Sequence, residues 1–462
     1  MSKLIEQFRG ILDDNAIMLG DAVSGRAVHV WDDSPIAAQV ILRPTTTEQV
    51  SAIMKLCDEA GQTVVAHGGR TGLVQSSITQ ADDVIVSLER MNAIEEVDEV
   101  GRTMTVQAGV PLQVLQDTAA EKGLFFPVDL GARGSCQIGG NVSTNAGGNR
   151  VIRFGMMRDN ILGIEAVLAD GTIVSSLNTM LKNNAGYDLK QLFIGTEGTL
   201  GIVTRLVLRL REAVTEQETA FVSFDTFDQV TGFLKYIDGA LGGRLSAYEV
   251  LWLDYYDLVT TAPATNRPPV EKTRPYYALV ESLGSTRDRE GFEAAFFQAL
   301  EDGLIADAAI AQSGAEAAAM WAIRDDVEHF FRYGRPQIFD VSIAIRYVGE
   351  YVDEVKRRLA ANWPHHYCFT FGHIGDGNIH FAITVPDAGP ADHRKVEECV
   401  YEPLQPYGGS VSAEHGIGLE KKDFLAISRS ADEIAVMRRL KHALDPRGIL
   451  NPGKIFEFEG AV

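Results

Sequence analysis

The sequence predicts a protein of mixed α-helices and β-strands that folds as two or three domains. Its 462 residues exceed what one hydrophobic core usually supports, and hydrophobic residues make up 45% of the chain, enough to fill more than one core. Strand and helix patterns alternate in the first part, and an Asp-Gly pair between two strand-like runs marks a hairpin in the second. Glycine-rich loops between these elements are candidate ligand sites.

The first element is a strand, helix, strand unit that leads into a glycine-rich turn. Residues 39–44 are expected to form the first strand, and Thr45 with Glu48 forms a capping box for a helix that ends at Gly61. Residues 62–73, QTVVAHGGRTGL, form the second strand and the turn, where backbone amides can approach phosphate oxygens without interference from Cβ atoms. The GGRTG stretch is equally compatible with a phosphate cradle and with a plain structural turn.

Two further glycine clusters follow in the first half of the chain. Residues 131–150 interleave six glycines with serine, threonine and asparagine, and residues 195–204 carry glycines at every third position before a strand with one exposed face. Neither cluster has the spacing of the dinucleotide fingerprint, so a nicotinamide cofactor is disfavoured. Three loops suit an extended cofactor such as a flavin dinucleotide, and the alternative is a scaffold of tight turns.

The stretch FGHIGDGNIHF, residues 371–381, predicts a hairpin that brings two histidines together. Asp376 and Gly377 favour a two-residue turn, which would place His373 opposite His380. Directly opposed residues have Cβ atoms about 4.5 to 5.5 Å apart, close enough for two imidazoles to share a divalent cation. An ordinary polar pair on a hairpin is the alternative.

A third ligand is available in SAEHGIG, residues 412–418. Glu414 and His415 are adjacent there, just before two glycines that permit a sharp bend. In a regular strand the two side chains would point to opposite faces, so both can serve one site only if the backbone departs from a strand. Glu414 could instead only cap a turn.

Charge and cysteine content restrict the class of protein. A net charge of −21 disfavours binding to nucleic acid or anionic lipid, because both require a positive surface. The four cysteines are far apart without paired ligand spacing and are expected as free thiols in a reducing compartment. No run of about 18 apolar residues occurs, which predicts a cytoplasmic protein without a transmembrane segment and leaves docking on a membrane surface open.

Several long motifs resemble the vanillyl-alcohol oxidase and p-cresol methylhydroxylase superfamily of flavoproteins. HGGRTGL, PVDLGARGSCQIGGNVSTNAGG and IGTEGTLGIVT are similar to its flavin-binding domain. GHIGDGNIH, AEHGIGLEK and the terminal ALDPRGILNPGKI resemble the branch that contains FAD-dependent D-lactate and D-2-hydroxyglutarate dehydrogenases. The resemblance implies an α+β fold with a two-part FAD-binding domain, residues 1–212 and 413–462, and an inserted α+β substrate-binding cap, residues 213–412.

The resemblance also implies the residues at the flavin. They are His67, Gly68, Gly69, Arg70, Thr71, Gly72, Gly134, Ser135, Gly139, Gly140, Asn141, Thr144, Gly147, Gly148, Gly201, Ile202, Val203 and Asn451. Some relatives bind flavin covalently through a histidine after the paired glycines, where this chain has Arg70. The FAD is therefore expected to be noncovalent.

For the chemistry, the resemblance implies His373, His380 and Glu414 as metal ligands and His415 as the catalytic base. A D-2-hydroxy acid would chelate the cation through its hydroxyl and carboxylate, and its hydride would pass to N5 of the flavin. Ligands of this kind suit zinc, with manganese or iron as alternatives. The electrons would then go to an acceptor other than a nicotinamide, such as an electron-transfer flavoprotein or a quinone, and a homodimer is expected from the family.

Four residues bear on the substrate. The resemblance implies Arg324 as the partner of the substrate carboxylate, and the alternative is a structural salt bridge. Glu328, Ile338 and Ala382 stand where the D-2-hydroxyglutarate enzymes are understood to carry threonine, lysine and asparagine. Loss of these polar groups should penalise a second carboxylate by several kcal/mol, which favours a monocarboxylate such as D-lactate.

Other functions stay open at this point. D-2-hydroxyglutarate or D-malate oxidation would require another cation for the second carboxylate, for which Arg346 is a candidate. Transfer of electrons to oxygen would make the chain an oxidase of glycolate or another 2-hydroxy acid, or one subunit of such an enzyme. A third hypothesis is a regulatory subunit that binds flavin or metal. His415 argues against it, because such a subunit needs no base beside the metal.

Overall fold

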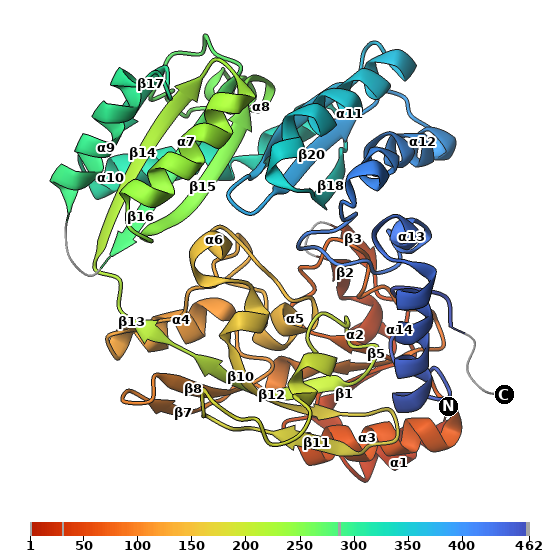
Figure 1. The fold of residues 1–462 in the computed structure, drawn as a ribbon. Helices are drawn as coiled ribbons and strands as arrows, with labels where there is room; N and C mark the ends of the chain where they lie inside the picture. Colours follow the sequence, from red (N-terminus) through yellow and green to blue (C-terminus); the bar gives the residue numbers. More distant parts are fainter. Residues whose placement is uncertain (1, 30–31, 285–287, 459–462) are drawn as a thin grey trace. The chain divides into compact units, whose positions relative to one another are not determined.

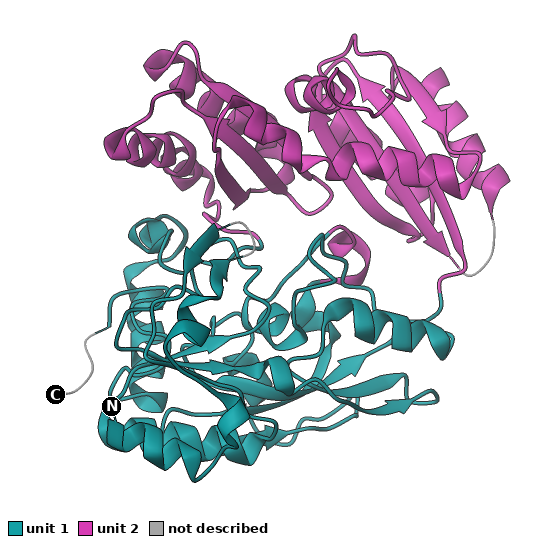
Figure 2. Ribbon diagram, turned by 180° about the vertical axis from the view of Figure 1, so that it is seen from behind, with its two compact units in different colours: residues 1–148, 156–213, 414–462 teal, residues 149–155, 214–413 magenta. Residues whose placement is uncertain are grey.

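The computed structural model describes residues 2–29, 32–284 and 288–458. The chain divides into two compact units, which Figure 2 shows in different colours. Unit 1 comprises residues 1–148, 156–213 and 414–462, and unit 2 comprises residues 149–155 and 214–413. Unit 1 is therefore assembled from stretches that are far apart in the sequence, and helices and strands occur in both units.

Unit 1 contains two main sheets (Figure 1). The four-stranded sheet has the order β1 (Ile17–Met18), β4 (Val40–Leu42), β6 (Val84–Ser87), β5 (Val64–His67), and the five-stranded sheet has the order β11 (Ile173–Ser176), β10 (Ile161–Val167), β12 (Ile202–Arg209), β8 (Thr103–Gln107), β7 (Ile94–Asp98). Two short pairs are β2 (Ala27–His29) with β3 (Asp32–Pro35) and β9 (Leu124–Phe125) with β13 (Arg211–Glu212). The α-helices are α1 (Ser2–Arg9), α2 (Asp21–Ser24), α3 (Thr47–Ala60), α4 (Leu112–Glu121), α5 (Ile138–Ser143), α13 (Leu425–Ser428) and α14 (Ala431–Leu444).

The expected strand, helix, strand unit is present as β4, α3 and β5. β4 and β5 both pair in parallel with β6, and α3 packs with α1 on the core of this sheet (Figure 1). The predicted capping residue was wrong by one position, because the hydroxyl of Thr46, rather than Thr45, accepts from the backbone N–H of Gln49. The side chain of Gln49 accepts from the N–H of Thr45, the residue before the N-cap, so the reciprocal bond to the N-cap N–H that completes a capping box is not formed. The helix ends at Gly61 in a left-handed conformation, as expected.

The strand after the third glycine cluster is more buried than its sequence indicated. β12 lies between β10 and β8 in the middle of the five-stranded sheet. Both of its faces are covered, and only Arg205 and Arg209 reach partial exposure. The expectation of one exposed face was therefore wrong, because alternating arginines were read as a solvent-facing row, whereas Arg205 pairs with Glu95 of β7.

Unit 2 is built on one antiparallel sheet of seven strands. Its order is β17 (Asp307–Ile310), β14 (Glu216–Phe224), β16 (Tyr276–Gly284), β15 (Leu245–Trp252), β19 (Tyr367–His373), β20 (Asn378–Thr384), β18 (Gln337–Ser342). The α-helices of the unit are α6 (Val151–Phe154), α7 (Phe227–Ala240), α8 (Leu253–Thr260), α9 (Arg289–Glu301), α10 (Gly314–Asp325), α11 (Val348–Asn362) and α12 (Pro390–Tyr401). A 3-10 helix, η5 (Val327–Tyr333), follows α10.

One face of this sheet carries an aromatic and aliphatic core that continues onto α8, α10 and η5. Phe371 stacks on Tyr255 of α8 there, with ring centroids 4.5 Å apart, and Phe330 of η5 packs against both rings at a tilt. On the opposite face, the hydroxyl of Tyr248 donates to the carbonyl of Val230 in α7. The strands β15, β19, β20 and β18 thus present a defined inner face toward α8, α10 and η5.

The hairpin forms, but the predicted two-residue turn at Asp376 and Gly377 was wrong. β19 ends at His373 and β20 begins at Asn378, so four residues make the turn. The register pairs His380 with Phe371 and not with His373. The wider turn buries Ile374 completely and lets Gly377 pack against the carbonyl of Ile343. The register differs from the expected one by two residues, which keeps every side chain on the face that was expected.

A search of the helices in the described ranges finds none that is both long and apolar enough to cross a membrane.

Candidate active site

The glycine-rich segments that were predicted to bind a cofactor converge in unit 1. The GGRTG loop, residues 68–72, directly follows β5, and α5 begins within SCQIGGN, residues 135–141. A Cβ atom at Gly69 would collide with the backbone of Ser135 and Cys136, so the two loops are in direct contact. The family resemblance implied residues of both segments at the same flavin cofactor, and one cofactor can contact both segments only if they lie close together.

Some of these glycines face protein, while others face open space. A Cβ atom at Gly139 would lie 2.6 Å from Cβ of Ala108, and one at Gly148 would collide with the carbonyl of Asp129. At Gly72, Gly134 and Gly140, by contrast, an added Cβ would meet no described atom within 4 Å. Glycine at these three positions is not needed for packing within the chain, which is consistent with backbone kept bare for a ligand.

Two buried acceptors beside the open glycines fit an FAD molecule. Oε1 of Gln137 and Oδ1 of Asn141 are shielded from solvent and have no hydrogen-bond partner among the described residues. Buried polar atoms in folded proteins are nearly always paired, so such atoms point to a partner that is not part of the chain. The ribityl hydroxyls and ring N–H group of a flavin cofactor are donors of the required kind.

Asn451 connects the C-terminal NPGK segment to the same region. Its N–H donates to the carbonyl of Val64 at 2.8 Å, its Oδ1 accepts from the N–H of Ala66 at 2.9 Å, and its Nδ2 donates to the carbonyl of Glu197. Asn451 is buried and has a positive φ of 42°, a conformation that asparagine tolerates better than most residues. The side chain that was expected beside the flavin ring thus fastens β5 to the 195–201 loop.

Glu197 is a residue of this region that the sequence analysis did not single out. Its buried carboxylate accepts from the hydroxyl of Ser76 at 2.6 Å and from the N–H groups of Ile417 and Gly418 at 2.7 and 2.9 Å. Burial raises the pKa of this carboxyl group, although these bonds oppose the rise. Glu197 thereby holds the backbone just after His415, and only its position between two glycines could have drawn attention to it.

The remaining predicted cofactor residues have clear structural roles. Nε2 of His67 lies 2.9 Å from the carbonyl of Ser77, and burial lowers the pKa of His67 to about 4. Arg70 has a φ of 56° and donates to the carbonyl of Ala27. Other predicted positions lie in backbone turns or in the core. The hydroxyl of Thr144 donates to the carbonyl of Gly140, and Gly147 and Gly148 follow α5. Gly201 packs against Phe193, and Ile202 and Val203 are core residues of β12.

In unit 2, the two predicted metal-binding histidines lie on the inner face of the sheet. His373 is the last residue of β19 and His380 lies on β20, diagonal to it across the pair. Their rings are nearly perpendicular, with centroids 5.2 Å apart, and both side chains are buried. The shifted register therefore still brings the imidazoles close enough to share one cation.

Glu414 and His415 follow directly after the point where the chain is fastened to β18. The hydroxyl of Ser412 and the N–H of Ala413 both donate to Oδ2 of Asp340 at 3.1 Å. Residues 413–415 form bends, and residues 412–416 include no strand, as was required if both side chains were to serve one site. Oε1 of Glu414 accepts from the N–H of Gly148.

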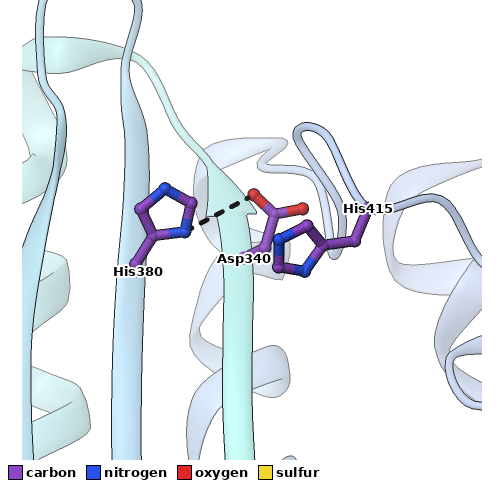
Figure 3. A group of neighbouring side chains, drawn as sticks. All are labelled: Asp340, His380 and His415. Atoms are coloured by element: carbon purple, nitrogen blue, oxygen red, sulfur yellow. Dashed lines mark ion pairs between the residues drawn. The ribbon is translucent and has the colours of Figure 1, made fainter. Parts of the chain in front are cut away.

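Two groups of side chains have ligand atoms close enough together to hold a metal ion. His373, His380 and Glu414 form the group expected from the sequence, and Asp340, His380 and His415 form a second that shares His380. Within each group the ligand atoms lie within 4.8 Å of one another. Figure 3 shows the second group, with His380 paired to Asp340 at 3.9 Å and His415 beside the same carboxylate.

Arg324 near the end of α10 is buried against an acidic partner. Its Nε donates to Oε2 of Glu249 at 2.8 Å, and its Nη2 lies 3.2 Å from Nε2 of His373. The other oxygen of Glu249 lies 2.6 Å from Nδ1 of His373. Burial alone would raise the pKa of Glu249, but His373 and Arg324 outweigh it and lower that pKa to about 2. The salt bridge anticipated as the alternative role of Arg324 is present, and it places the guanidinium directly beside a candidate metal ligand.

The positions that were expected to select the substrate tail form an apolar row. Ile338 of β18 pairs with Ala382 of β20, which pairs with Phe369 of β19. This row lies two residues along the strands from His380, on the same face. Ala382 is completely buried and Phe369 nearly so, whereas Glu328 in η5 is exposed.

Comparison with known proteins places the chain in a family. Residues 38–176 match an FAD binding domain, and residues 214–455, more than half of the chain, match the C-terminal domain of FAD linked oxidases. The chain belongs to this family of FAD-linked oxidases. It is therefore an FAD-dependent oxidoreductase, as the motifs had indicated.

Relatives of this family match the chain over most of its length. A D-2-hydroxyglutarate dehydrogenase of Xanthomonas citri pv. viticola is 38% identical over 437 residues, covering 93% of this chain and 91% of the relative. A Schizosaccharomyces pombe protein, provisionally named a mitochondrial D-lactate dehydrogenase, is 38% identical over 428 residues, covering 90% of this chain and 81% of that one. Both kinds of dehydrogenase named by the sequence resemblance thus occur among the relatives.

Solved structures confirm the predicted fold. A p-cresol methylhydroxylase with substrate bound matches with a TM-score of 0.76 at 16% identity, covering 99% of this chain and 97% of that protein. An alkyldihydroxyacetonephosphate synthase matches with a TM-score of 0.75 at 15% identity, covering 98% of this chain and 86% of the synthase. The α+β fold of the p-cresol methylhydroxylase type, inferred from the motifs, is therefore correct.

Proposed function

We propose that this protein oxidises a D-2-hydroxy acid to the corresponding 2-oxo acid and that its preferred substrate is a monocarboxylate such as D-lactate. The observation that carries this proposal is the inner face of the unit 2 sheet. There, a buried arginine and two close histidines lie next to an apolar row. A small 2-hydroxy acid has one carboxylate, which a cationic side chain can bind, and a short tail, which an apolar row can cover.

The polar end of the site suits a 2-hydroxy carboxylate. Arg324 would bind the substrate carboxylate, since its Nη groups are not engaged by Glu249. His373, His380 and Glu414 would hold a divalent cation, for which zinc is the first candidate and manganese or iron the alternatives. When bound, such a cation supplies Lewis acidity toward the substrate hydroxyl.

The base is proposed to be His415. Imidazole has an ordinary pKa of about 6.5, close to working pH, so a neutral histidine can take the hydroxyl proton in the oxidation. His415 follows the anchored Ala413, and its ligand atom lies within 4.8 Å of those of His380 and Asp340. FAD, held by the glycine loops of unit 1, supplies the two-electron acceptor when bound.

The apolar row favours a substrate without a second charge. Two residues along a strand span about 6.6 Å, so Ile338 and Ala382 lie about one short side chain away from His380. A second carboxylate there would lose its hydration beside aliphatic and aromatic groups, at a cost of several kcal/mol. A methyl or ethyl tail has no charge to desolvate, so its transfer from water to this apolar row carries no such cost.

D-2-hydroxyglutarate is the second candidate substrate, because several relatives at 36 to 39% identity carry that name. Arg346 was the residue that could have restored binding of a diacid. It lies beyond Ser342 at the opposite end of β18 from Ile338, and its guanidinium stacks over the ring of Tyr347. This location gives the second carboxylate no support, so the relatives' substrate is ranked below a monocarboxylate here.

The visible spectrum of the purified, FAD-loaded protein under anaerobic conditions tests the proposal. D-lactate should bleach the flavin band rapidly, L-lactate should not, and D-2-hydroxyglutarate should act much more slowly. Fast bleaching mainly by D-2-hydroxyglutarate would show that the row of Ile338 and Ala382 was misinterpreted. Bleaching by none of the three would contradict the oxidation of a D-2-hydroxy acid.

The same preparation tests the finer proposals about the fate of the electrons. We propose an acceptor other than a nicotinamide, such as an electron-transfer flavoprotein or a quinone, because the chain has no dinucleotide fingerprint. A quinone analogue should therefore restore the flavin band and NAD should not, and hydrogen peroxide formed in air would instead favour an oxidase. Sedimentation would test the homodimer, and fractionation of cells the cytoplasmic location.

A further inference from the structure

Glu249 occupies a position between the two groups to which the proposed function assigns metal and substrate binding. It lies on β15 directly across from His373 of β19 and is 1% exposed. One carboxylate oxygen lies 2.6 Å from Nδ1 of His373, and the other accepts from Nε of Arg324 at 2.8 Å. Each oxygen of this buried carboxylate is therefore committed to a different functional side chain.

The contact with His373 fixes the orientation of the imidazole. A carboxylate only accepts hydrogen bonds, so Nδ1 of His373 carries a proton. A guanidinium only donates, so Nε2, which lies 3.2 Å from Nη2 of Arg324, keeps its lone pair and directs it toward that side chain. Histidine ligands of metals commonly have an acceptor on the far nitrogen, which holds the ring and raises its basicity.

The contact with Arg324 fixes the guanidinium in a complementary way. Glu249 engages Nε, Nη1 lies 3.6 Å from the carboxylate of Asp325, and the guanidinium lies over the ring of Phe371 at 5.2 Å. An arginine held through Nε and stacked on an aromatic ring retains donors for a second anion. Without Glu249, the buried charge would be left with the longer contact of Nη1 with Asp325 at 3.6 Å, and the side chain would lose the anchor on Nε.

We propose that Glu249 is a positioning residue that orients both a metal ligand, His373, and the substrate-binding Arg324. This inference rests on the proposed function, because it assumes that His373 binds metal and that Arg324 binds the substrate carboxylate. Nothing in the sequence connects these residues, since Glu249 is the one charged residue of β15 and lies 124 positions from His373. The link exists only because the sheet order places β15 beside β19.

The test uses the full-length FAD-loaded protein, stripped of metal, and the variants E249Q, E249D and D254N. Glutamine keeps the volume of Glu249, but its amide group can donate to Nδ1 of His373 and force the proton onto Nε2. D254N is the matched control, because Asp254 is also a carboxylate paired with a cation in unit 2, with Lys356, and accepts from the N–H of Thr370 at 2.8 Å. It contacts none of the residues to which the proposed function assigns metal or substrate.

The readouts are the zinc dissociation constant, from competition with a chromophoric chelator, and the KM and kcat for D-lactate. E249Q should weaken zinc binding by about 10- to 100-fold and raise KM at saturating zinc, while E249D should recover part of both losses. D254N should leave both quantities within about twofold of the wild type. In an H373A background, E249Q should have no further effect on zinc affinity.

The outcomes separate this inference from the proposed function. E249Q with wild-type zinc affinity and wild-type KM would overturn the positioning role and leave the proposed function standing. A wild-type protein that binds no zinc and whose flavin is not reduced by any D-2-hydroxy acid would overturn both. If E249Q does not fold, E249D decides, since a shorter carboxylate that changed neither zinc affinity nor KM would contradict the role of Glu249.

Discussion

The backbone N–H of Ala413 donates to Oδ2 of Asp340, and this bond fastens the chain one residue before Glu414. The hydroxyl of Ser412 donates to the same oxygen, while Oδ1 of Asp340 accepts from Nδ2 of Asn378 at 2.8 Å. Asp340 is completely buried on β18. One carboxylate thus controls where the chain leaves the sheet before two proposed active-site residues.

Removal of that carboxylate should damage the site without a direct change to any proposed metal ligand. D340A should lower kcat for D-lactate and zinc affinity each by about 10- to 100-fold, because His380 loses the contact with this carboxylate and the 412–415 segment loses its anchor. Zinc content after dialysis and steady-state turnover measure the two effects. S412A removes only one bond to the same oxygen and should cost about 1 kcal/mol or less. Equal behaviour of D340A and wild type would refute this view of Asp340.

Substrate preference should change when polar groups are restored in the apolar row. The double variant I338K/A382N places a cation and an amide on neighbouring positions of β18 and β20. Pairing of a second carboxylate should shift the ratio of kcat/KM for D-2-hydroxyglutarate over D-lactate by about 100-fold or more. I338M keeps the row apolar and should leave the ratio within about threefold. No shift in the double variant would place the tail of the substrate elsewhere.

Two adjacent glycines in α5 should respond differently to alanine. At Gly140 a Cβ atom meets no described atom, so G140A should leave the stability of the flavin-free protein within about 1 kcal/mol and weaken FAD binding by about tenfold or more. At Gly139 the Cβ atom would lie 2.6 Å from Ala108, so G139A should destabilise the flavin-free protein by about 1 to 3 kcal/mol. Denaturant unfolding and FAD titration give the two quantities. If G140A bound FAD normally, the open space at this glycine would have another purpose.

Stability should fall with acid in a way that depends on His67. Burial lowers the pKa of His67 to about 4, whereas the unfolded chain has a pKa near 6.5. Between these values the unfolded state binds a proton that the folded state does not, so stability is fully present above about pH 6.5 and is lost as the pH falls toward 4. The loss at pH 4 is about 3 kcal/mol.

The variant H67Q checks this prediction by urea unfolding at several pH values between 7.5 and 4.5. Its stability should depend less on pH than that of the wild type over this interval. The difference between the two proteins should shrink as the pH falls, because only the wild type loses the contribution of His67. Parallel curves for the two proteins would contradict the assignment of a neutral, buried histidine.

Local sequence signals predicted elements well where the stabilising contacts are themselves local. The helix that ends at Gly61 and the strands beside it followed from periodicity and capping, and only the capping residue was displaced by one. The hairpin was recognised from Asp376 and Gly377, but its register was wrong, because the burial of Ile374 depends on packing that no turn signal contains. Arg205 in β12 was misread for the same reason, since its partner Glu95 lies on another strand.

The proposed functional residues that could be found from the sequence are also those that local motifs or family resemblance identify. Histidines 373 and 380 were found because motif and hairpin place them together, and Arg324 was found by resemblance. Glu249, Asp340 and Glu197 were missed, because each reaches its partners through sheet order or through loops distant in sequence. Carboxylates that position other residues show no spacing pattern, so only the three-dimensional structure can identify them.

The parallel bridge between Val64 and Leu450 has a consequence for biosynthesis. β5, which leads into the first glycine loop, obtains its neighbour on that side only from the final residues of the chain, through Ile449 and Asn451. Residues 214–413, most of unit 2, are synthesised before this neighbour exists. The nascent protein must therefore keep an unpaired strand edge beside β5 until residues 449–451 have left the ribosome.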